Sequence, residues 1–247
     1  GSHGVYLADG ASSCTIGGSG AGTGNVISGN EGDGVRLYGW TVEDNALRAN
    51  KIGINAAGDV AIPNDDGVRV ERAHDTTIDT GNIISGNRDV GIRIANESHD
   101  VTIASNSIGT NARGLIHLGN GAGGVRIEGG SHHNTVGSWN TIAFNTGDGV
   151  HVEGRDSLSN TITRNSITDN SGLGIALAGG GNLELTPPVV GPVTTTYVDG
   201  IACPFCRVEV FTDFGGEGAI YKGHADADRN GLWTYSGSAS ISTFLRT

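Results

Sequence analysis

Short alternations of apolar and polar residues recur through the first three quarters of the chain. Seven segments share the pattern Gly-(Val/Ile)-x-(Val/Ile/Leu), and their first residues lie 24 to 33 residues apart: Gly4, Gly34, Gly67, Gly91, Gly124, Gly149 and Gly174. Alternation with a period of two, in β-branched residues, predicts a short strand at each position. A repeat spacing in this range indicates a solenoid.

Each repeat holds three such strands and no helical period. In the repeat that begins at Gly91, Ile92 and Ile94 flank Arg93, and further apolar residues follow at 101–103 and at Ile108. Strands this short must stack on neighbouring turns, about 4.8 Å away, to bury an apolar face. The pattern therefore predicts an all-β protein: a right-handed parallel β-helix of about seven turns. Its interior is expected to contain Ile92, Ile94, Ile103, Ile108, Val125, Ile127 and Val150.

Asparagines recur with the repeats. Six pairs have the form Asn-x4-Asn: Asn25/Asn30, Asn50/Asn55, Asn82/Asn87, Asn106/Asn111, Asn140/Asn145 and Asn165/Asn170. Asparagine tolerates the left-handed conformation of tight corners, and stacked asparagines can join their amides into a ladder. We interpret these residues as structural and not as a site.

Alternate turns carry an insertion. The extra residues lie at 53–64 and 109–120, and the spacing of the asparagine pairs shows a longer period of two turns. The unit that was duplicated was therefore a pair of turns. Two similar loops should project from one edge of the β-helix, two turns apart.

The composition changes after Gly181. We expect the β-helix to occupy residues 4–185 and a small immunoglobulin-like β-sandwich to occupy 186–247. Fresh strand patterns are seen at Thr194–Val198, Val208–Phe211, Ile220–Ala225 and Trp233–Tyr235. The final residues, Phe244–Thr247, have the character of an unfinished strand, which predicts a truncated sandwich with an exposed edge.

Charge and targeting patterns narrow the function classes. The formal net charge is −11, which argues against a nucleic-acid partner. No apolar run is long enough to span a membrane. Gly1-Ser2-His3 resembles the remnant of a cleaved tag, and the chain has no methionine, so we expect a piece of a longer protein that lacks its signal peptide.

Several sequence strings carry a resemblance to a known group. Residues 4–181 resemble the right-handed parallel β-helix repeat proteins of bacterial surfaces, within the pectin-lyase-like superfamily. The similar strings are Asn25–Asn30, Ile52–Gly58, Asn134–Gly137 and Leu173–Leu177. Residues 198–236 resemble the β-sandwich module that commonly follows such repeats, through Ala202–Phe211 and Asp226–Gly231. The resemblance implies a secreted or surface-exposed bacterial protein, but the superfamily contains both enzymes and proteins without known activity, so the fold alone assigns no reaction.

The central residue of the repeated strand is the first candidate site. On successive turns it is Tyr6, Arg36, Arg69, Arg93, Arg126, His151 and Ala176. Two positions later stand Glu71, Glu128 and Glu153. Either each glutamate neutralises an arginine on a solvated face, or Arg36, Arg69, Arg93, Arg126 and His151 recognise an acidic or hydroxyl-rich polysaccharide.

Acidic residues precede the repeated glycine on adjacent turns. Asp33, Asp65 and Asp66 could form an acid and base pair or hold a cation. Their layout resembles a degraded polygalacturonase pattern, but Val90 and Glu128 stand where that pattern has histidine and lysine. Asp-Gly is also an ordinary corner sequence. We therefore assign no catalytic residue. The alternative is a polysaccharide lyase or glycoside hydrolase acting on acidic polysaccharides such as pectate.

A transition-metal site is a further possibility on three consecutive corners. The sequences there are His74-Asp75, His99-Asp100 and His132-His133. Stacked imidazoles could bind zinc or a similar ion, whereas corners also favour small polar residues without any ligand.

The C-terminal part holds two more candidates. Asp226, Asp228 and Asn230 match the start of a calcium loop, but Gly237 stands where the bidentate acid is expected, and a tight hairpin turn explains the same string. Cys203 and Cys206 are spaced for a local disulfide in an exported protein, with Cys14 left as a buried free thiol.

Together these observations predict a non-catalytic secreted or surface module. Its role is structural or adhesive, with weak binding of acidic glycans. We expect no cofactor apart from a calcium ion at most, a polysaccharide as the one candidate partner, no nucleic-acid partner and no membrane span.

Overall fold

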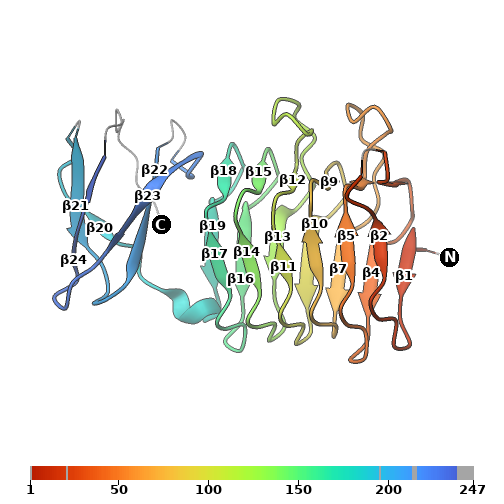
Figure 1. The fold of residues 1–247 in the computed structure, drawn as a ribbon, viewed down its shortest axis with the longest axis horizontal. Coiled ribbons are helices and arrows are strands. Elements are labelled where there is room, and N and C mark those ends of the chain that lie inside the picture. The colour runs from red at the N-terminus through yellow and green to blue at the C-terminus, as the bar shows by residue number, and fades with distance from the viewer. Residues whose placement is uncertain (1, 21, 195, 213–215, 238–247) are drawn as a thin grey trace.

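The computed structural model describes the chain except residues 1, 21, 195, 213–215 and 238–247. Figure 1 shows a row of stacked turns followed by antiparallel strands at the C-terminal end. The regular elements among the described residues are short strands and one 3-10 helix, η1 (Gly181–Glu184), joined by turns and loops. The all-β prediction is confirmed.

Three parallel sheets wrap the solenoid. The first contains β1 (Val5–Leu7), β4 (Val35–Tyr38), β7 (Val68–Glu71), β10 (Val90–Ala95), β13 (Gly123–Ile127), β16 (Val150–Glu153) and β19 (Ile175–Ala178). The second contains β2 (Thr15–Gly17), β5 (Ala46–Arg48), β8 (Thr77–Asp79), β11 (Thr102–Ile103), β14 (Thr135–Gly137) and β17 (Thr161–Thr163). The third contains β3 (Val26–Ile27), β6 (Lys51–Ile52), β9 (Ile83–Ile84), β12 (Ser107–Ile108), β15 (Thr141–Ala143) and β18 (Ser166–Thr168). The β-helix thus has six complete turns and the first strand of a seventh.

The interior is a continuous aliphatic stack. Ile94 pairs in register with Val70 on one side and Ile127 on the other, and all three side chains are fully buried. The seven residues expected to point inward are each at most 1% exposed. Because Leu, Val and Ile repeat at the same position, each turn packs its aliphatic side chains against those of its neighbours.

Two buried ladders of asparagine side chains run along the solenoid. The first joins Asn25, Asn50, Asn82, Asn106, Asn140 and Asn165. The second joins Asn30, Asn64, Asn87, Asn120, Asn145 and Asn170. In each, the amide nitrogen Nδ2 of one turn donates to Oδ1 of the next, at 2.7–3.1 Å. The structural interpretation of the asparagines is confirmed.

Two members of the predicted pairs are in neither ladder. Asn55 and Asn111 instead accept backbone N–H groups within the inserted loops, for example from Gly58 and Leu115. Asn64 and Asn120, at the far ends of the insertions, take the ladder positions. The pairing by spacing was wrong there because each insertion lies between the corner and the ladder residue. The loops themselves project from one edge, as predicted (Figure 1).

The C-terminal part contains two antiparallel sheets. One is formed by β20 (Val189–Val190), β21 (Tyr197–Ile201) and β24 (Leu232–Ser236), the other by β22 (Arg207–Thr212) and β23 (Ile220–Asp226). Both contribute to one core, which comprises Val198, Val208, Val210, Ala225, Ala227 and Trp233. This shared core supports a small sandwich, while its immunoglobulin-like type stays a prediction.

Two predictions about the C-terminal part concern the start of its first long strand and the end of the chain. The strand expected at Thr194–Val198 is found at Tyr197–Ile201, because the Thr194 hydroxyl accepts the Tyr197 N–H in a turn. The segment Phe244–Thr247 is outside the described residues. We propose that the boundary between the two domains lies between residues 185 and 186, because η1 ends at Glu184 and β20 begins at Val189.

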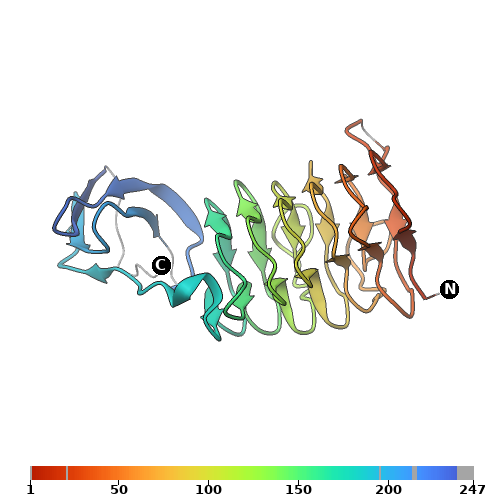
Figure 2. The same cartoon turned by 90° about the horizontal axis from the view of Figure 1, so that it is seen from below.

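The C-terminal sheets contact the last turn of the solenoid (Figure 2). The Glu217 carboxylate accepts the backbone N–H of Asn170 at 3.2 Å and its Nδ2 at 2.9 Å. It therefore stands where the next asparagine of the second ladder would be. Glu209 accepts the Thr163 hydroxyl and the backbone N–H of Arg164. Two glutamates thus satisfy donors that a further turn would otherwise satisfy.

Candidate functional site

The arginine column lies on the first sheet, where parallel pairing fixes its register. We use this name for Arg36, Arg69, Arg93, Arg126 and His151 on β4, β7, β10, β13 and β16. Backbone register places each directly beside the next, with Tyr6 before Arg36 and Ala176 after His151. The predicted column is thus one continuous line of side chains on one sheet.

Carboxylates bridge the column from turn to turn. Glu71 Oε2 lies 2.7 Å from Arg36 and 3.2 Å from Arg69. Glu128 joins Arg93, at 2.8 Å, to Arg126, at 2.9 Å. Each glutamate therefore serves two arginines, because its position two residues after the column residue brings it between adjacent strands.

Arg93 is the most enclosed member. Its side chain is 10% exposed and contacts Asp66 at 2.7 Å, Asp89 at 2.7 Å and Glu128 at 2.8 Å. Burial disfavours the charged guanidinium, but hydrogen bonds and the charge of Asp66 and Glu128 outweigh it and raise the pKa of Arg93. Arg93 is therefore held by three carboxylates and has little capacity left for a ligand.

The same balance holds at the neighbouring glutamates. Burial would raise the pKa of Glu71, but the Asn96 amide and the guanidinium groups of Arg69 and Arg36 lower it. Hydrogen bonding from Arg126 lowers the pKa of Glu153. Both side chains thus remain ionised and engaged. Seven carboxylates contact the column, against four guanidinium groups: Asp33, Asp66, Glu71, Asp89, Glu128, Asp148 and Glu153. The excess negative charge opposes binding of an anionic chain.

The three candidate catalytic acids are not equivalent. Asp33 and Asp66 are buried on adjacent turns, whereas Asp65 is exposed. Asp66 accepts the backbone N–H of Val90 and the guanidinium of Arg93. Asp33 Oδ2 has no hydrogen-bond partner, and burial, followed by the charge of Asp66, raises the pKa of Asp33. The fold brings two of the three acids together, with one of them committed to an ion pair.

The corner histidines form a stack. The rings of His74 and His99 are parallel, with centroids 4.8 Å apart, and the His132 ring lies 5.2 Å from that of His99. Nδ1 of His74 and of His99 each lies 2.8 Å from the aspartate that follows in sequence. The Asp75 hydrogen bond raises the pKa of His74. The sequence predicted the stacking, because the three corners are equivalent positions.

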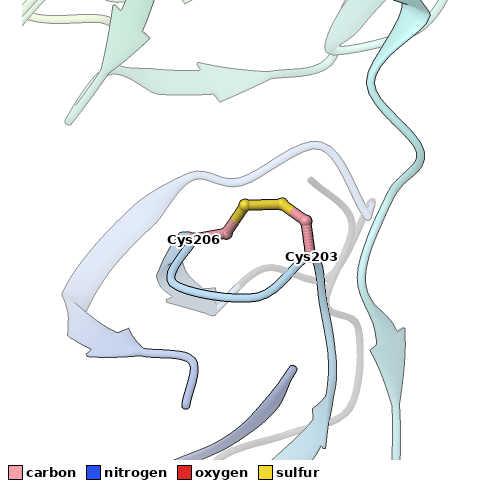
Figure 3. Close-up of a disulfide and its surroundings, with 2 residues drawn as sticks. All are labelled: Cys203 and Cys206. Carbon is pink, nitrogen blue, oxygen red and sulfur yellow. A yellow bond between two sulfur atoms is a disulfide. The ribbon is translucent and has the colours of Figure 1, made fainter. Parts of the chain in front are cut away.

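The C-terminal candidates lie in turns. Asp228 accepts the backbone N–H groups of Asn230 and Leu232, at 2.7 and 2.9 Å, and Asp226 pairs with Arg207 at 2.9 Å. The Asp228 bonds close the turn between β23 and β24, which lie in different sheets, so the turn is not the hairpin that the sequence predicts; the Asp226–Arg207 pair joins β23 to β22. All these bonds use oxygens that a calcium ion would need. Cys203 and Cys206 are joined in a disulfide that closes the turn between β21 and β22 (Figure 3). Cys14 is a free thiol and is partly buried.

These features define a class of protein: a parallel β-helix repeat protein whose arginine column is paired with its own carboxylates. The family model of NosD, described as periplasmic copper-binding protein, matches residues 55–186. The chain belongs to this family. No curated protein and no solved structure gave a significant match. Among the described residues, no helix is both long and apolar enough to cross a membrane.

One further site was not found by sequence reasoning. A cavity lies between the last turn of the solenoid and the C-terminal sheets, and its walls come from residues within 160–188 and 202–211 and from residues 217–218. No spacing in the sequence signals it, because the two sets of residues meet only through the packing of two differently built parts.

Proposed function

We propose that this protein is a non-catalytic repeat module with a structural role, exported to the periplasm or cell surface. The supporting observation is the network of ion pairs through Glu71, Asp66 and Glu128 that connects four successive turns along the arginine column. Each bridging glutamate ties one strand to the next on the solvated face, as the aliphatic stack does inside. The family's description as periplasmic supports export.

Adhesive contact with acidic polysaccharide is the finer part of this proposal. The arginines repeat at the stacking distance of the strands, about 4.8 Å, and offer planar donors to an extended chain. A ligand must compete with Glu71 and Glu128, and it meets an excess of carboxylates. The binding is therefore weak and is lost as salt is added.

Calorimetric titration with polygalacturonate and alginate at low salt tests this contact. We expect weak heats that disappear at high salt and in an Arg69→Ala/Arg93→Ala protein. An Arg113→Ala/Arg229→Ala protein, altered at exposed positions outside the column, is the matched control. Circular dichroism must first show that both proteins are folded. Binding that survives loss of Arg69 and Arg93 would remove the arginine column from the proposal, and the structural role would stand alone.

Catalysis on acidic polysaccharides is the second candidate, and one observation favours it. The raised pKa of Asp33, beside Asp66 on the next turn, is a property of a general acid. Against it, Asp66 is bonded to Arg93, so the second carboxylate is engaged. We expect no release of reducing ends and no unsaturated product from pectate. Cleavage that is abolished by Asp66→Asn would make this protein an enzyme.

The family description includes copper binding, but the histidine, cysteine and acidic residues in the part of the chain that the structure describes fit a copper site poorly. Copper favours imidazole, thiolate and thioether ligands that converge on one point. The stacked rings of His74 and His99 instead direct their nitrogens in parallel, and the neighbouring aspartates occupy both Nδ1 atoms. No three histidine, cysteine or acidic side chains converge within the described residues. We therefore assign no copper chemistry to this chain.

A further inference from the structure

The cavity between the solenoid and the C-terminal sheets has a volume of about 560 Å³. This is within the range of sites that hold small molecules, roughly 300–1,000 Å³. Its floor is the open end of the aliphatic stack, formed by Ile162, Ile167, Ile175 and Leu177. Its roof is formed by Ala202, Val208, Phe211 and the Cys203–Cys206 disulfide.

The C-terminal sheets do not pack closely against the end of the solenoid at this place. The cavity opens to solvent and is many times the size of a water molecule, so it is not a void left by close packing. Water inside it would meet mainly aliphatic carbon. At the rim, Leu173 and Leu185 are 53% and 61% exposed although both border the cavity. A cavity with apolar side chains both at its floor and at its rim can bind a flexible hydrocarbon chain.

Charged groups at the rim indicate the polar end of that ligand. The carboxylates of Glu209, Glu217 and Glu184 each accept hydrogen bonds from the protein. Arg207, the second cation in the lining, pairs with Asp226. The guanidinium of Arg164 contacts the Tyr221 ring, 5.7 Å from its centroid, and forms no ion pair within the described residues.

We propose that this cavity binds a single-chain fatty acid, with its hydrocarbon chain against the end of the aliphatic stack and its carboxylate at Arg164. The apolar part of the lining is aliphatic apart from Phe211, so it favours an alkyl chain over a flat ring system, while Asn160, Asn165 and Thr186 add polar groups to the walls. The proposal is independent of any contact with polysaccharide, because no residue of the arginine column lines the cavity.

Titration of the full chain with dodecanoate, below its micelle concentration, tests the proposal by calorimetry. We expect saturable binding of one molecule, with acetate showing none. Ala202→Phe places a ring in the cavity and should weaken binding at least tenfold. Arg164→Gln should weaken dodecanoate binding several-fold and leave binding of uncharged dodecanol unchanged. Leu115→Ser, at an exposed leucine of a distant loop, is the control and should bind as the parent does.

The outcomes separate this site from adsorption to the surface. Should Ala202→Phe fail to fold, Leu173→Ser at the exposed rim replaces it and should weaken binding by a smaller factor. Absence of saturable binding overturns the proposal. So does binding that is equal in the parent, Ala202→Phe and Arg164→Gln proteins. Binding of lysophosphatidylcholine in preference to dodecanoate overturns the assignment of the carboxylate to Arg164.

Discussion

The solenoid and the C-terminal sheets are held together in different ways. In the solenoid every turn repeats the same inward aliphatic and asparagine positions, and each residue is supported by its equivalents one turn away. In the C-terminal part, six residues of five different strands and turns form one core, and a disulfide closes one turn. In the solenoid a further turn can be added by the same contacts, but each turn is stable only when its neighbouring turns are folded. The C-terminal part is a closed unit that ends the row and supplies Glu217 as the last partner of a ladder.

The largest effect should follow from a charge inside the stack. Ile94→Asp places an unpaired carboxylate between Val70 and Ile127, so we expect a loss of more than about 4 kcal/mol of unfolding free energy and the melting of several turns. Circular dichroism and urea unfolding measure it. Thr102→Asp, at an exposed position of β11, the next strand along the chain and part of another sheet, is the control and should change little. If the urea midpoint of Ile94→Asp equals that of the parent protein, the stability of a turn does not depend on its neighbouring turns.

Removing one rung of a ladder should have the next largest effect. Asn106→Ala deletes bonds to Asn140, Ile78 and Asn82 and leaves buried groups unpaired, which we expect to cost about 3 kcal/mol. Asn230→Ala in the exposed turn between β23 and β24 should cost less than about 0.5 kcal/mol. Hydrogen exchange should show lost protection on both sides of Asn106. Equal losses for the two variants would contradict the difference between a ladder residue and a residue in an exposed turn.

Reduction of the disulfide should affect the C-terminal sheets alone. Cys203 and Cys206 close a loop of a few residues, so its loss should cost that part about 2 kcal/mol. Thiol titration of denatured protein purified without reductant should find one free thiol, from Cys14. Hydrogen exchange should then show faster opening of β21–β24 after reduction, with the solenoid unchanged. Three free thiols would count against both the disulfide and export.

The smallest effect concerns a single buried acid. Burial raises the pKa of Asp33, so the protonated form is favoured in the folded state. That stabilisation is present at low pH and is lost as the pH rises through the folded pKa. Asp33→Asn should therefore raise the unfolding free energy by about 1 kcal/mol at neutral pH, where the buried carboxylate is ionised. It should leave the unfolding free energy unchanged at low pH, where Asp33 is protonated. Asp65→Asn, at the exposed neighbour, should show no such dependence on pH. A loss of stability at neutral pH would indicate that the His3 and Arg36 contacts dominate.

The sequence by itself determined the solenoid. Ile92, Ile94 and Ile127 could be placed inside because a period of two leaves only one face for each, and stacking makes equivalent positions neighbours. The same reasoning predicted the arginine column and the histidine stack. It failed at Asn55 and Asn111, where an insertion separated the corner from the ladder residue, and spacing alone could not say on which side the extra residues lie.

The tertiary structure alone decided which groups satisfy one another. That Glu71 serves both Arg36 and Arg69, and that Asp66 holds Arg93, depends on side-chain conformations that no repeat pattern specifies. The cavity is the clearest case. Its floor is a regular consequence of the repeat, but its roof comes from a part with its own core, and the space between them arises because two surfaces built by different rules meet without full complementarity.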